Sequence, residues 1–416
     1  MARLPVPGQD SGTWGSVLND YLSQVHKADG TLKDNIITAS HIQSGAIVES
    51  LLSGAVQSKL NSSTAGRVNV RDYGAVGDGV ADDSAAIKAA QAAMTDGKTL
   101  YFPDGTYRFA QESPTDGGAV VLAGLNHAGV YFDSGAMLLM DNLDSGGMGT
   151  SDGILVTGKA SYITIVNAHV RWKTVPAARG GHANGIHAVG YPSDGTPAVG
   201  WTGSTGLVQF LTVINARVER SPEAGIIFMG ASDVAVIGTK SIDTLADGLH
   251  FNACRRVSVN GHHSLNVGDD GIAFVNYYHA TQKWDDPNIG PFWFSGLSEW
   301  CSSGSASAVV VADNRANGFR VQMGKDIEIN GLSIHNKDAV GNITTARLDV
   351  NNPWQSIASE NITVKGVTAS DCEGGLTLQT YNIDGDDNEM WWRHKNILID
   401  GVTVENIGNW SMSTEG

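Results

Sequence analysis

A tripeptide recurs along the chain: a small or acidic residue, then glycine, then an aliphatic or aromatic residue. Asp247-Gly248-Leu249 returns 23 residues later as Asp270-Gly271-Ile272. The whole series, with spacings of 40, 23, 23, 47 and 57, runs through Asn184-Gly185-Ile186, Ala224-Gly225-Ile226, the two aspartate copies, Asn317-Gly318-Phe319 and Gly374-Gly375-Leu376. A position that returns once per coil, or after an insertion or a skipped copy, predicts a solenoid of stacked coils.

Short runs of Val, Ile and Leu, broken by Gly, Asn and Asp, fill the chain between these copies. Apolar and polar residues alternate within the runs and no long helical stretch separates them, which predicts short strands. The runs are 153–156, 163–166, 211–214, 234–237 and 257–260. Gly at 51 copies and only 17% charged residues favour tight turns over long charged helices. The fold expected is an all-β solenoid with a packed interior.

The first 62 residues have a different texture. A helix is predicted from about residue 10 to 27, capped by Asp10 or Ser11, with one apolar stripe along it. Residues 36–60 carry widely spaced aliphatic residues that cannot form a core alone, so we expect this neck to pack against copies of itself in an oligomer. A flexible linker with incidental aliphatic residues is the alternative.

The small residues at 61–66 mark the expected boundary, which divides the chain into 1–62 and 63–416. An alanine-rich stretch from Ala85 to Met94 predicts a helix, capped by Asp82 or Asp83. Its apolar face would close the open end of the solenoid and keep exposed backbone from pairing with another chain.

Composition excludes several classes of protein. With 43 Asp and Glu against 27 Lys and Arg, the formal net charge of −16 would repel nucleic acid. No apolar run of membrane-spanning length is present and the first residues lack a signal-peptide core, so neither a membrane span nor ordinary secretion is expected. The cysteines are too few and scattered for a disulfide framework or a zinc site, and we expect them to pack as small buried residues: Cys254, Cys301 and Cys372.

Three carboxylates stand at the repeat: Asp247, Asp269 and Asp270. A repeat of one coil would put Asp247 beside Asp270 on strands about 4.8 Å apart, and such acids repel unless one holds a proton. A protonated carboxylic acid beside an ionised carboxylate is the pair of groups that glycoside hydrolases use to cleave glycosidic bonds. The alternative is that Asp-Gly is a common turn pair, whose carboxylates would only lie in solvent at the corners of the coils. Three acids in register favour catalysis over this alternative. We expect the carboxylates to face outward.

Two stretches carry a resemblance to known families. Val68 to Ser84, the following helix and Thr99 to Tyr107 resemble the first segment of the pectate-lyase-3 group. This implies a right-handed, single-stranded parallel β-helix over 63–416. The opening from Pro7 to Gly15, together with the neck, is similar to tail proteins of actinobacteriophages. This implies a virion-attachment segment over 1–62, a homotrimer, phage tail or baseplate partners, and a virion tail at the host cell surface.

A second resemblance covers the acids. Ala246-Asp247-Gly248, Gly268-Asp269-Asp270 and Asn317-Gly318-Phe319-Arg320-Val321-Gln322 resemble the patterns of pectin-degrading glycoside hydrolases such as polygalacturonases. The resemblance implies that Asp270 is the general acid, that Asp247 and Asp269 hold the attacking water, that the reaction inverts, and that Arg320 holds the sugar. Two departures count against a pectin-like substrate: no Gly-His-Gly follows the paired aspartates, and Gln322 stands where that family has a uronate-binding lysine.

Other candidate binding residues are aromatic rings and histidines. Tyr278, Trp284 and Trp293 lie in an aromatic-dense insertion after the acids, suited to stack on sugar faces or to form a small core for a long loop. His187 and His250 stand three residues after equivalent repeat positions, so they would line one groove, with His250 near the acids, or simply pack on the coil surface. The acidic run 384–389 lacks the spacing of a calcium loop, so no metal or cofactor is expected.

Three functions compete. The first is a tail-associated depolymerase that hydrolyses a host surface polysaccharide. The second is a polysaccharide lyase, disfavoured because few Lys and Arg residues lie near the acids in the sequence. The third is a non-catalytic tail-fibre adhesin that binds glycans through aromatic residues.

Overall fold

The computed structural model describes residues 66–180, 183–190, 206–278, 293–294, 301–313, 315–345, 358–380, 393–408 and 413–415, and, near the N-terminus, residues 4, 6, 9–24, 26 and 27. The chain divides into two compact units, Met1–Ala65 and Gly66–Gly416, which are described separately.

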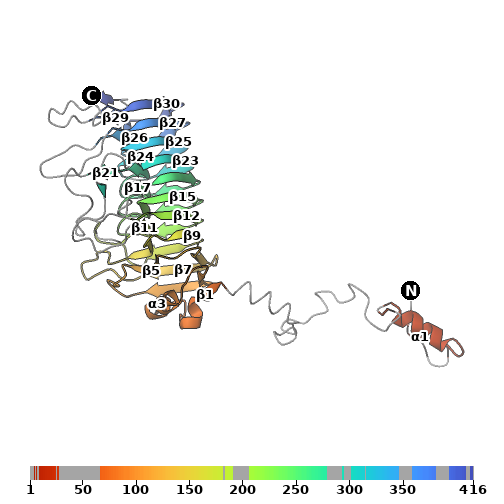
Figure 1. Cartoon of the computed structure of the whole chain (residues 1–416). Helices are drawn as coiled ribbons and strands as arrows, with labels where there is room; N and C mark the ends of the chain where they lie inside the picture. The colour runs from red at the N-terminus through yellow and green to blue at the C-terminus, as the bar shows by residue number, and fades with distance from the viewer. Residues whose placement is uncertain are drawn as a thin grey trace. The chain divides into compact units, whose positions relative to one another are not determined.

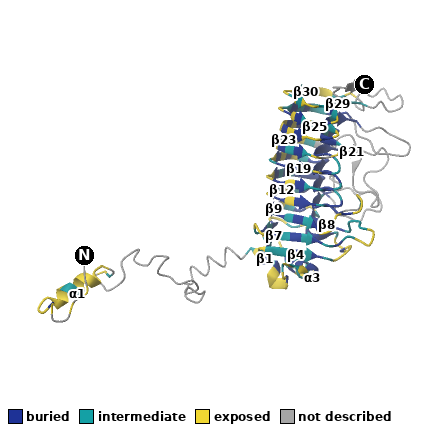
Figure 2. Cartoon of the chain, turned by 180° about the vertical axis from the view of Figure 1, so that it is seen from behind, coloured by how far each residue is buried: buried dark blue, intermediate teal, exposed yellow. Residues whose placement is uncertain are grey.

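The first unit contains helix α1 (Trp14–Leu22), which has no buried residue and is exposed in Figure 2. The helix is shorter than the expected 10–27, and Thr13 occupies its N-cap position. Asp10 does not cap it because its carboxylate accepts the N–H of Val6 at 2.7 Å, within the turn that precedes the helix. The neck at 36–60 lies outside the described residues, so its packing stays a prediction.

The second unit is a right-handed parallel β-helix, which confirms the expected fold class (Figure 1). Its described coils build two large sheets and a small one. The ten-stranded sheet comprises β5 (Gly118–Ala123), β8 (Asp152–Thr157), β11 (Ile186–Val189), β14 (Ile226–Met229), β17 (Leu249–Asn252), β20 (Ile272–Val275), β24 (Asn317–Gln322), β26 (Ala339–Thr344), β29 (Gly374–Gln379) and β32 (Ser413–Glu415).

The twenty-stranded sheet is made of two columns that the long strands β23 and β25 join. Its strands are β1 (Arg67–Asn69), β2 (Asp78–Asp82), β3 (Thr99–Phe102), β4 (Gly105–Phe109), β6 (Gly129–Phe132), β7 (Ala136–Met140), β9 (Ser161–Val166), β10 (His169–Trp172), β12 (Val208–Ile214), β13 (Arg217–Glu219), β15 (Ala231–Ile237), β16 (Lys240–Ile242), β18 (Arg255–Asn260), β19 (His263–Leu265), β23 (Cys301–Ala312), β25 (Gly324–His335), β27 (Glu360–Lys365), β28 (Thr368–Ser370), β30 (Lys395–Asp400) and β31 (Thr403–Glu405). A separate pair joins β21 (Tyr277–Tyr278) to β22 (Trp293–Phe294).

Corner residues in the left-handed backbone region turn each coil from one column to the next. Asn and Asp tolerate this region better than most residues, and here their side chains also bond from coil to coil. Asn266 Nδ2 donates to Asp243 Oδ1, and Asn336 Nδ2 donates to Asp313 Oδ1, both at 2.7 Å. These ladders hold the corners in register and explain the many Asn and Asp residues between the strands.

The interior is a continuous apolar core along the coils, and buried residues line the strands in Figure 2. Phe228, Phe251 and Phe274 stack on consecutive coils with ring centroids 5.2 and 5.1 Å apart. Cys254 and Cys372 are buried and unbridged, as expected for small packing residues. All five expected strand runs fall within strands, namely β8, β9, β12, β15 and β18.

A helix packs against the first coils, as predicted. α3 (Ser84–Ala92), which follows the short 3-10 helix η3 (Val70–Tyr73), buries Ile87 and Ala90 against the core. Asp83 occupies its N-cap position, but the Asp83 carboxylate accepts the N–H groups of Val76 and Gly77 instead, at 2.6 and 3.2 Å. Asp83 therefore ties the preceding loop to the helix start. Among the described residues, neither helix is both long and apolar enough to cross a bilayer.

Candidate functional site

The tripeptide repeat forms one ladder along the ten-stranded sheet. Gly225 N–H donates to Asp247 O, Gly248 N–H to Asp270 O and Gly271 N–H to Asn317 O, each at 2.9 Å. The spacing of 57 residues hides a skipped coil, because Ala339 lies between the last two recognised copies and pairs with Asn317 on one side and with Gly374 on the other. The ladder also begins earlier than the sequence indicated, since Asp152 lies one coil before Asn184.

Asp247, Asp269 and Asp270 lie together: one carboxylate oxygen of each is within 4.8 Å of the others. The N–H of Asp270 also donates to Asp247 Oδ1 at 2.8 Å, so the backbone joins the two coils at the acids. The carboxylates of Asp247 and Asp270 are covered rather than open at the surface, since these residues are only 5% and 3% exposed. The Asp269 side chain is the most open of the three, at 27%.

His250 lies against Asp247. Its Nδ1 is 2.5 Å from Asp247 Oδ2, and both side chains are buried. Burial by itself raises the pKa of Asp247, but the charges of His250, Arg179 and Arg320 and the His250 hydrogen bond outweigh it and lower the pKa below its usual value. Asp247 is therefore held as a carboxylate.

Asp270 has the opposite balance. Burial, together with the charges of Asp247 and Asp269, raises the pKa of Asp270 to about 7, although Arg320 acts to lower it. Arg320 Nε lies 2.7 Å from Asp270 Oδ2, and Asn317 Nδ2 donates to Asp270 Oδ1 at 2.7 Å. Two neighbouring carboxylates thus have pKa values moved apart, which is how environments separate a proton donor from a proton acceptor.

Three charged residues near the acids escaped the sequence analysis. Arg179 reaches Asp269 Oδ2 with Nη1, at 2.5 Å, and Glu223 Oε2 with Nε, at 3.0 Å. Lys337 is buried, its Nζ donates to the carbonyl oxygen of Arg315, and burial lowers its pKa to about 8 while the charges of Asp270 and Asp269 oppose that shift. None stands in a recognisable motif, so no local signal could have found them.

His187 does not join the acids. It occupies the same outward row as His250 and Arg320, running His187, Ile227, His250, Ala273 and Arg320 on consecutive coils. However, His187 Nδ1 pairs with Asp152 Oδ2 at 2.8 Å. Asp152 is three coils from Asp247, a distance of about 14 Å at 4.8 Å per coil. The row is shared, as expected, but His187 belongs to a separate buried pair.

The predicted aromatic residues are only partly described. Tyr278 pairs with Phe294, and Trp293 with Tyr277, through the backbone of β21 and β22. Trp284 lies outside the described residues, as does the acidic run 384–389. Sugar stacking by Tyr278, Trp284 and Trp293 therefore stays a prediction.

The fold places this unit among the right-handed parallel β-helix proteins. Residues 67–124 match the family described as rhamnogalacturonase A/epimerase, pectate lyase-like, which confirms the resemblance of that segment. The polygalacturonase of Erwinia carotovora ssp. carotovora has the same fold, with a TM-score of 0.51, 10% identity, and coverage of 82% of this chain and 95% of that one.

Two curated relatives come from Azotobacter vinelandii. Mannuronan C5-epimerase AlgE2 is 40% identical over 79 residues, which is 18% of this chain and 8% of the epimerase. Mannuronan C5-epimerase AlgE6 is 40% identical over 101 residues, 23% of this chain and 10% of the epimerase. The chain thus matches only a small part of the length of these relatives.

Proposed function

We propose that this protein is a glycoside hydrolase that cleaves a polysaccharide on a host cell surface. The observation that carries the proposal is the pair Asp247 and Asp270, whose pKa values are moved in opposite directions although the Asp270 backbone N–H donates to the Asp247 carboxylate. At neutral pH a substantial share of Asp270 keeps its proton while Asp247 is ionised. Glycosidic hydrolysis needs one acid and one base in that state.

In the proposed reaction Asp270 gives its proton to the glycosidic oxygen as the bond from that oxygen to the anomeric carbon breaks. A water molecule attacks the anomeric carbon, and Asp247, aided by Asp269, takes a proton from that water. The products are a new reducing end and a free hydroxyl, and proton exchange with solvent resets both acids. Arg320 holds the Asp270 carboxylate and, with 28% of its side chain exposed, can also contact the sugar.

The stereochemical outcome stays a prediction. Inverting pairs stand roughly 6.5–9.5 Å apart and retaining pairs roughly 5–5.5 Å. One carboxylate oxygen of each acid lies within 4.8 Å of the others, which is closer than the separation typical of inverting pairs. The support for inversion therefore comes from the sequence resemblance. Nuclear magnetic resonance of the first product would distinguish the anomers.

A lyase is the second candidate, and two observations favour keeping it. Arg179 and Lys337 lie near the acids although they are remote in sequence. The scarcity of basic residues close to the acids in the sequence is therefore no longer an argument against a lyase reaction. Three carboxylate oxygens within 4.8 Å would also suit a calcium ion. A lyase product would absorb ultraviolet light at its new double bond, whereas a hydrolase product would not.

The proposed setting is a phage tail, with residues 1–62 binding tail or baseplate proteins and the chain forming a homotrimer. Support comes from the resemblance of Pro7 to Gly15 and of the neck at 36–60 to tail proteins. Light scattering of the full chain tests the trimer, and a monomer mass would contradict it. A non-catalytic adhesin is the remaining alternative.

The deciding experiment measures reducing ends released from purified surface glycans of candidate host bacteria. Asp270→Asn should abolish release while leaving the fold and glycan binding intact. Asp152→Asn is the matched control, because Asp152 also accepts bonds from a histidine and from the next coil but lies outside the acid cluster. Equal activity of wild type and Asp270→Asn would remove Asp270 from the mechanism. Glycan binding without release by the wild type would favour the adhesin.

A further inference from the structure

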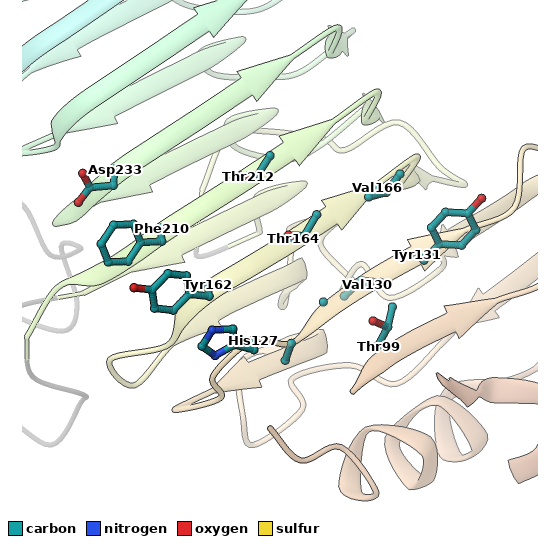
Figure 3. Close-up of a pocket in the computed structure, with 12 residues that line it drawn as sticks. Thr99, His127, Val130, Tyr131, Tyr162, Thr164, Val166, Phe210, Thr212 and Asp233 are labelled. Carbon is teal, nitrogen blue, oxygen red and sulfur yellow. The ribbon is translucent and has the colours of Figure 1, made fainter. Parts of the chain in front are cut away.

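A hollow lies on the twenty-stranded sheet (Figure 3), whereas Asp247 and Asp270 directly precede strands of the ten-stranded sheet. Its volume is about 550 Å³, within the size range of small-molecule sites. Strands β6, β9 and β12 and the residues just before them supply most of its lining. The proposed hydrolysis uses none of these residues.

Three aromatic rings from successive coils form one wall of the hollow, as Figure 3 shows. The His127 and Tyr162 rings stack with centroids 4.4 Å apart, and the Tyr162 and Phe210 rings follow at 4.5 Å. Tyr162 and Phe210 are nonetheless 47% and 41% exposed. Large rings left this open in a row are a feature of surfaces that bind a partner or a ligand.

The floor and the opposite wall are mostly polar or open. Thr99, Gly129, Thr164 and Thr212 occupy one outward row on four successive coils. Gly129 adds no side chain to this row, and a Cβ there would collide with the carbonyl oxygen of Thr164 on the next coil. Tyr131 lines the far side. Hydroxyl groups thus stand beside aromatic rings on two successive coils, as Thr164 with Tyr162 and as Thr212 with Phe210.

The backbone conformation of the three ring-bearing residues is one that large side chains rarely adopt. His127, Tyr162 and Phe210 have φ of 51°, 54° and 54°, in the left-handed region that bulky side chains rarely adopt. The same row continues on later coils with Asp233, Arg256, Ser303, Asp326, Asn361 and Asn396, which are polar and mostly better suited to that region. The left-handed backbone belongs to the coil corner in every case, so backbone preference does not explain why rings stand at these three positions.

The carboxylate that lines the hollow is paired, and the Arg67 guanidinium lies over the ring of the lining residue Tyr131, 5.1 Å from its centroid. Asp233 is the carboxylate among the described lining residues, and Arg256 neutralises it with two bonds of 2.7 Å, from Nε to Oδ1 and from Nη2 to Oδ2. A cationic ligand would find no unpaired carboxylate among the described lining residues. A ligand with apolar CH faces and many hydroxyl groups matches both the rings and the threonines.

We infer that this hollow, lined by Tyr162, Phe210 and Thr212, is a second saccharide-binding site that takes a neutral glycan chain. It is separate from the proposed catalytic acids and works without them. Since ring and hydroxyl stand together on the two coils of Tyr162 and Phe210, a linear glycan that crosses these coils would meet rings on one side and hydroxyl groups on the other. The site would keep the protein on a polymer surface while cleavage takes place elsewhere.

The test uses the full chain and three neutral probes: maltohexaose, cellohexaose and laminarihexaose at millimolar concentration. Saturation-transfer nuclear magnetic resonance should detect binding of at least one probe to the wild type. The double variant Tyr162→Ser/Phe210→Ser should weaken that binding at least about tenfold, and Thr212→Val should weaken it less. Leu398→Ser is the matched control, because Leu398 is 48% exposed on the same sheet but does not line the hollow.

Several outcomes would overturn the inference. They are no binding of any probe to the wild type, unchanged binding by a folded double variant, or a double variant whose main change is loss of self-association in light scattering, which would make the hollow a contact between copies of the chain. Asp270→Asn should keep probe binding unchanged. Failure of this site therefore leaves the proposed hydrolysis standing, and failure of hydrolysis leaves this site standing.

Discussion

Asp270 donates its backbone N–H to the Oδ1 atom of Asp247 at 2.8 Å, so the residue proposed as acid helps to keep the residue proposed as base ionised. A hydrogen bond to a carboxylate favours its charged form. At the Asp270 side chain, burial outweighs the interactions that favour the ionised form, and the pKa of Asp270 rises to about 7. One coil of offset thus gives two aspartates different protonation states.

The first prediction concerns the pH dependence of cleavage. The acid must carry its proton, so kcat/KM should fall about tenfold per pH unit as the pH rises above about 7, where Asp270 ionises. The base must be ionised, so the acidic limb should lie below the ordinary aspartate pKa of 3.8. Initial rates across the pH range check both limbs. A rate that stays constant well above pH 7 would contradict Asp270 as the acid.

The second prediction concerns stability. The pKa of Asp270 is raised in the folded state, so its contribution to stability is fully present below about pH 4 and is lost as the pH rises through about 7. Asp270→Asn cannot ionise, so above pH 7 it should be more stable than the wild type by up to about 4 kcal/mol, and the difference should vanish at low pH. Urea unfolding at pH 4 and pH 8 measures this. An equal gap at both values would show that ionisation is not the cause.

The third prediction separates the two histidines. His250→Ala removes the largest of the charge effects that lower the pKa of Asp247, so the acidic limb of kcat/KM should move to higher pH and activity near pH 5 should drop about tenfold or more. His187→Ala is the matched control, since His187 pairs with Asp152 in the same way but on a distant coil. The pH profile of His187→Ala should match that of the wild type. If both variants shift it alike, the effect of His250 is structural.

The fourth prediction addresses the core. Phe251 is fully buried and stacks between Phe228 and Phe274, so Phe251→Ala should lower the free energy of unfolding by about 3–5 kcal/mol. Leu398→Ala, at a site that is 48% exposed, should change it by less than about 0.5 kcal/mol. Denaturant titration compares the two. A small effect at Phe251 would mean that the stacked rings can close the cavity.

The sequence predicted the solenoid, five of its strands, its capping helix and the three neighbouring acids. These predictions succeeded because a repeat along the chain becomes a repeat in space when each coil stacks on the previous one. Asp247 and Asp270 are one coil apart in the sequence and hydrogen bond in the structure. The sequence spacing between neighbouring coils was enough to predict that these two residues lie side by side.

Only the tertiary structure decided what else surrounds those positions. Arg179 contacts Asp269 across 90 residues of sequence, and the rings of Tyr162 and Phe210 stack although a long insertion separates them. The burial that moves the pKa of Asp270 likewise depends on several coils at once. There are two physical reasons. Insertions of unequal length decide which residues lie side by side on the same face of the β-helix, and burial and charge depend on all residues nearby in space. Neither has a signature in the local sequence.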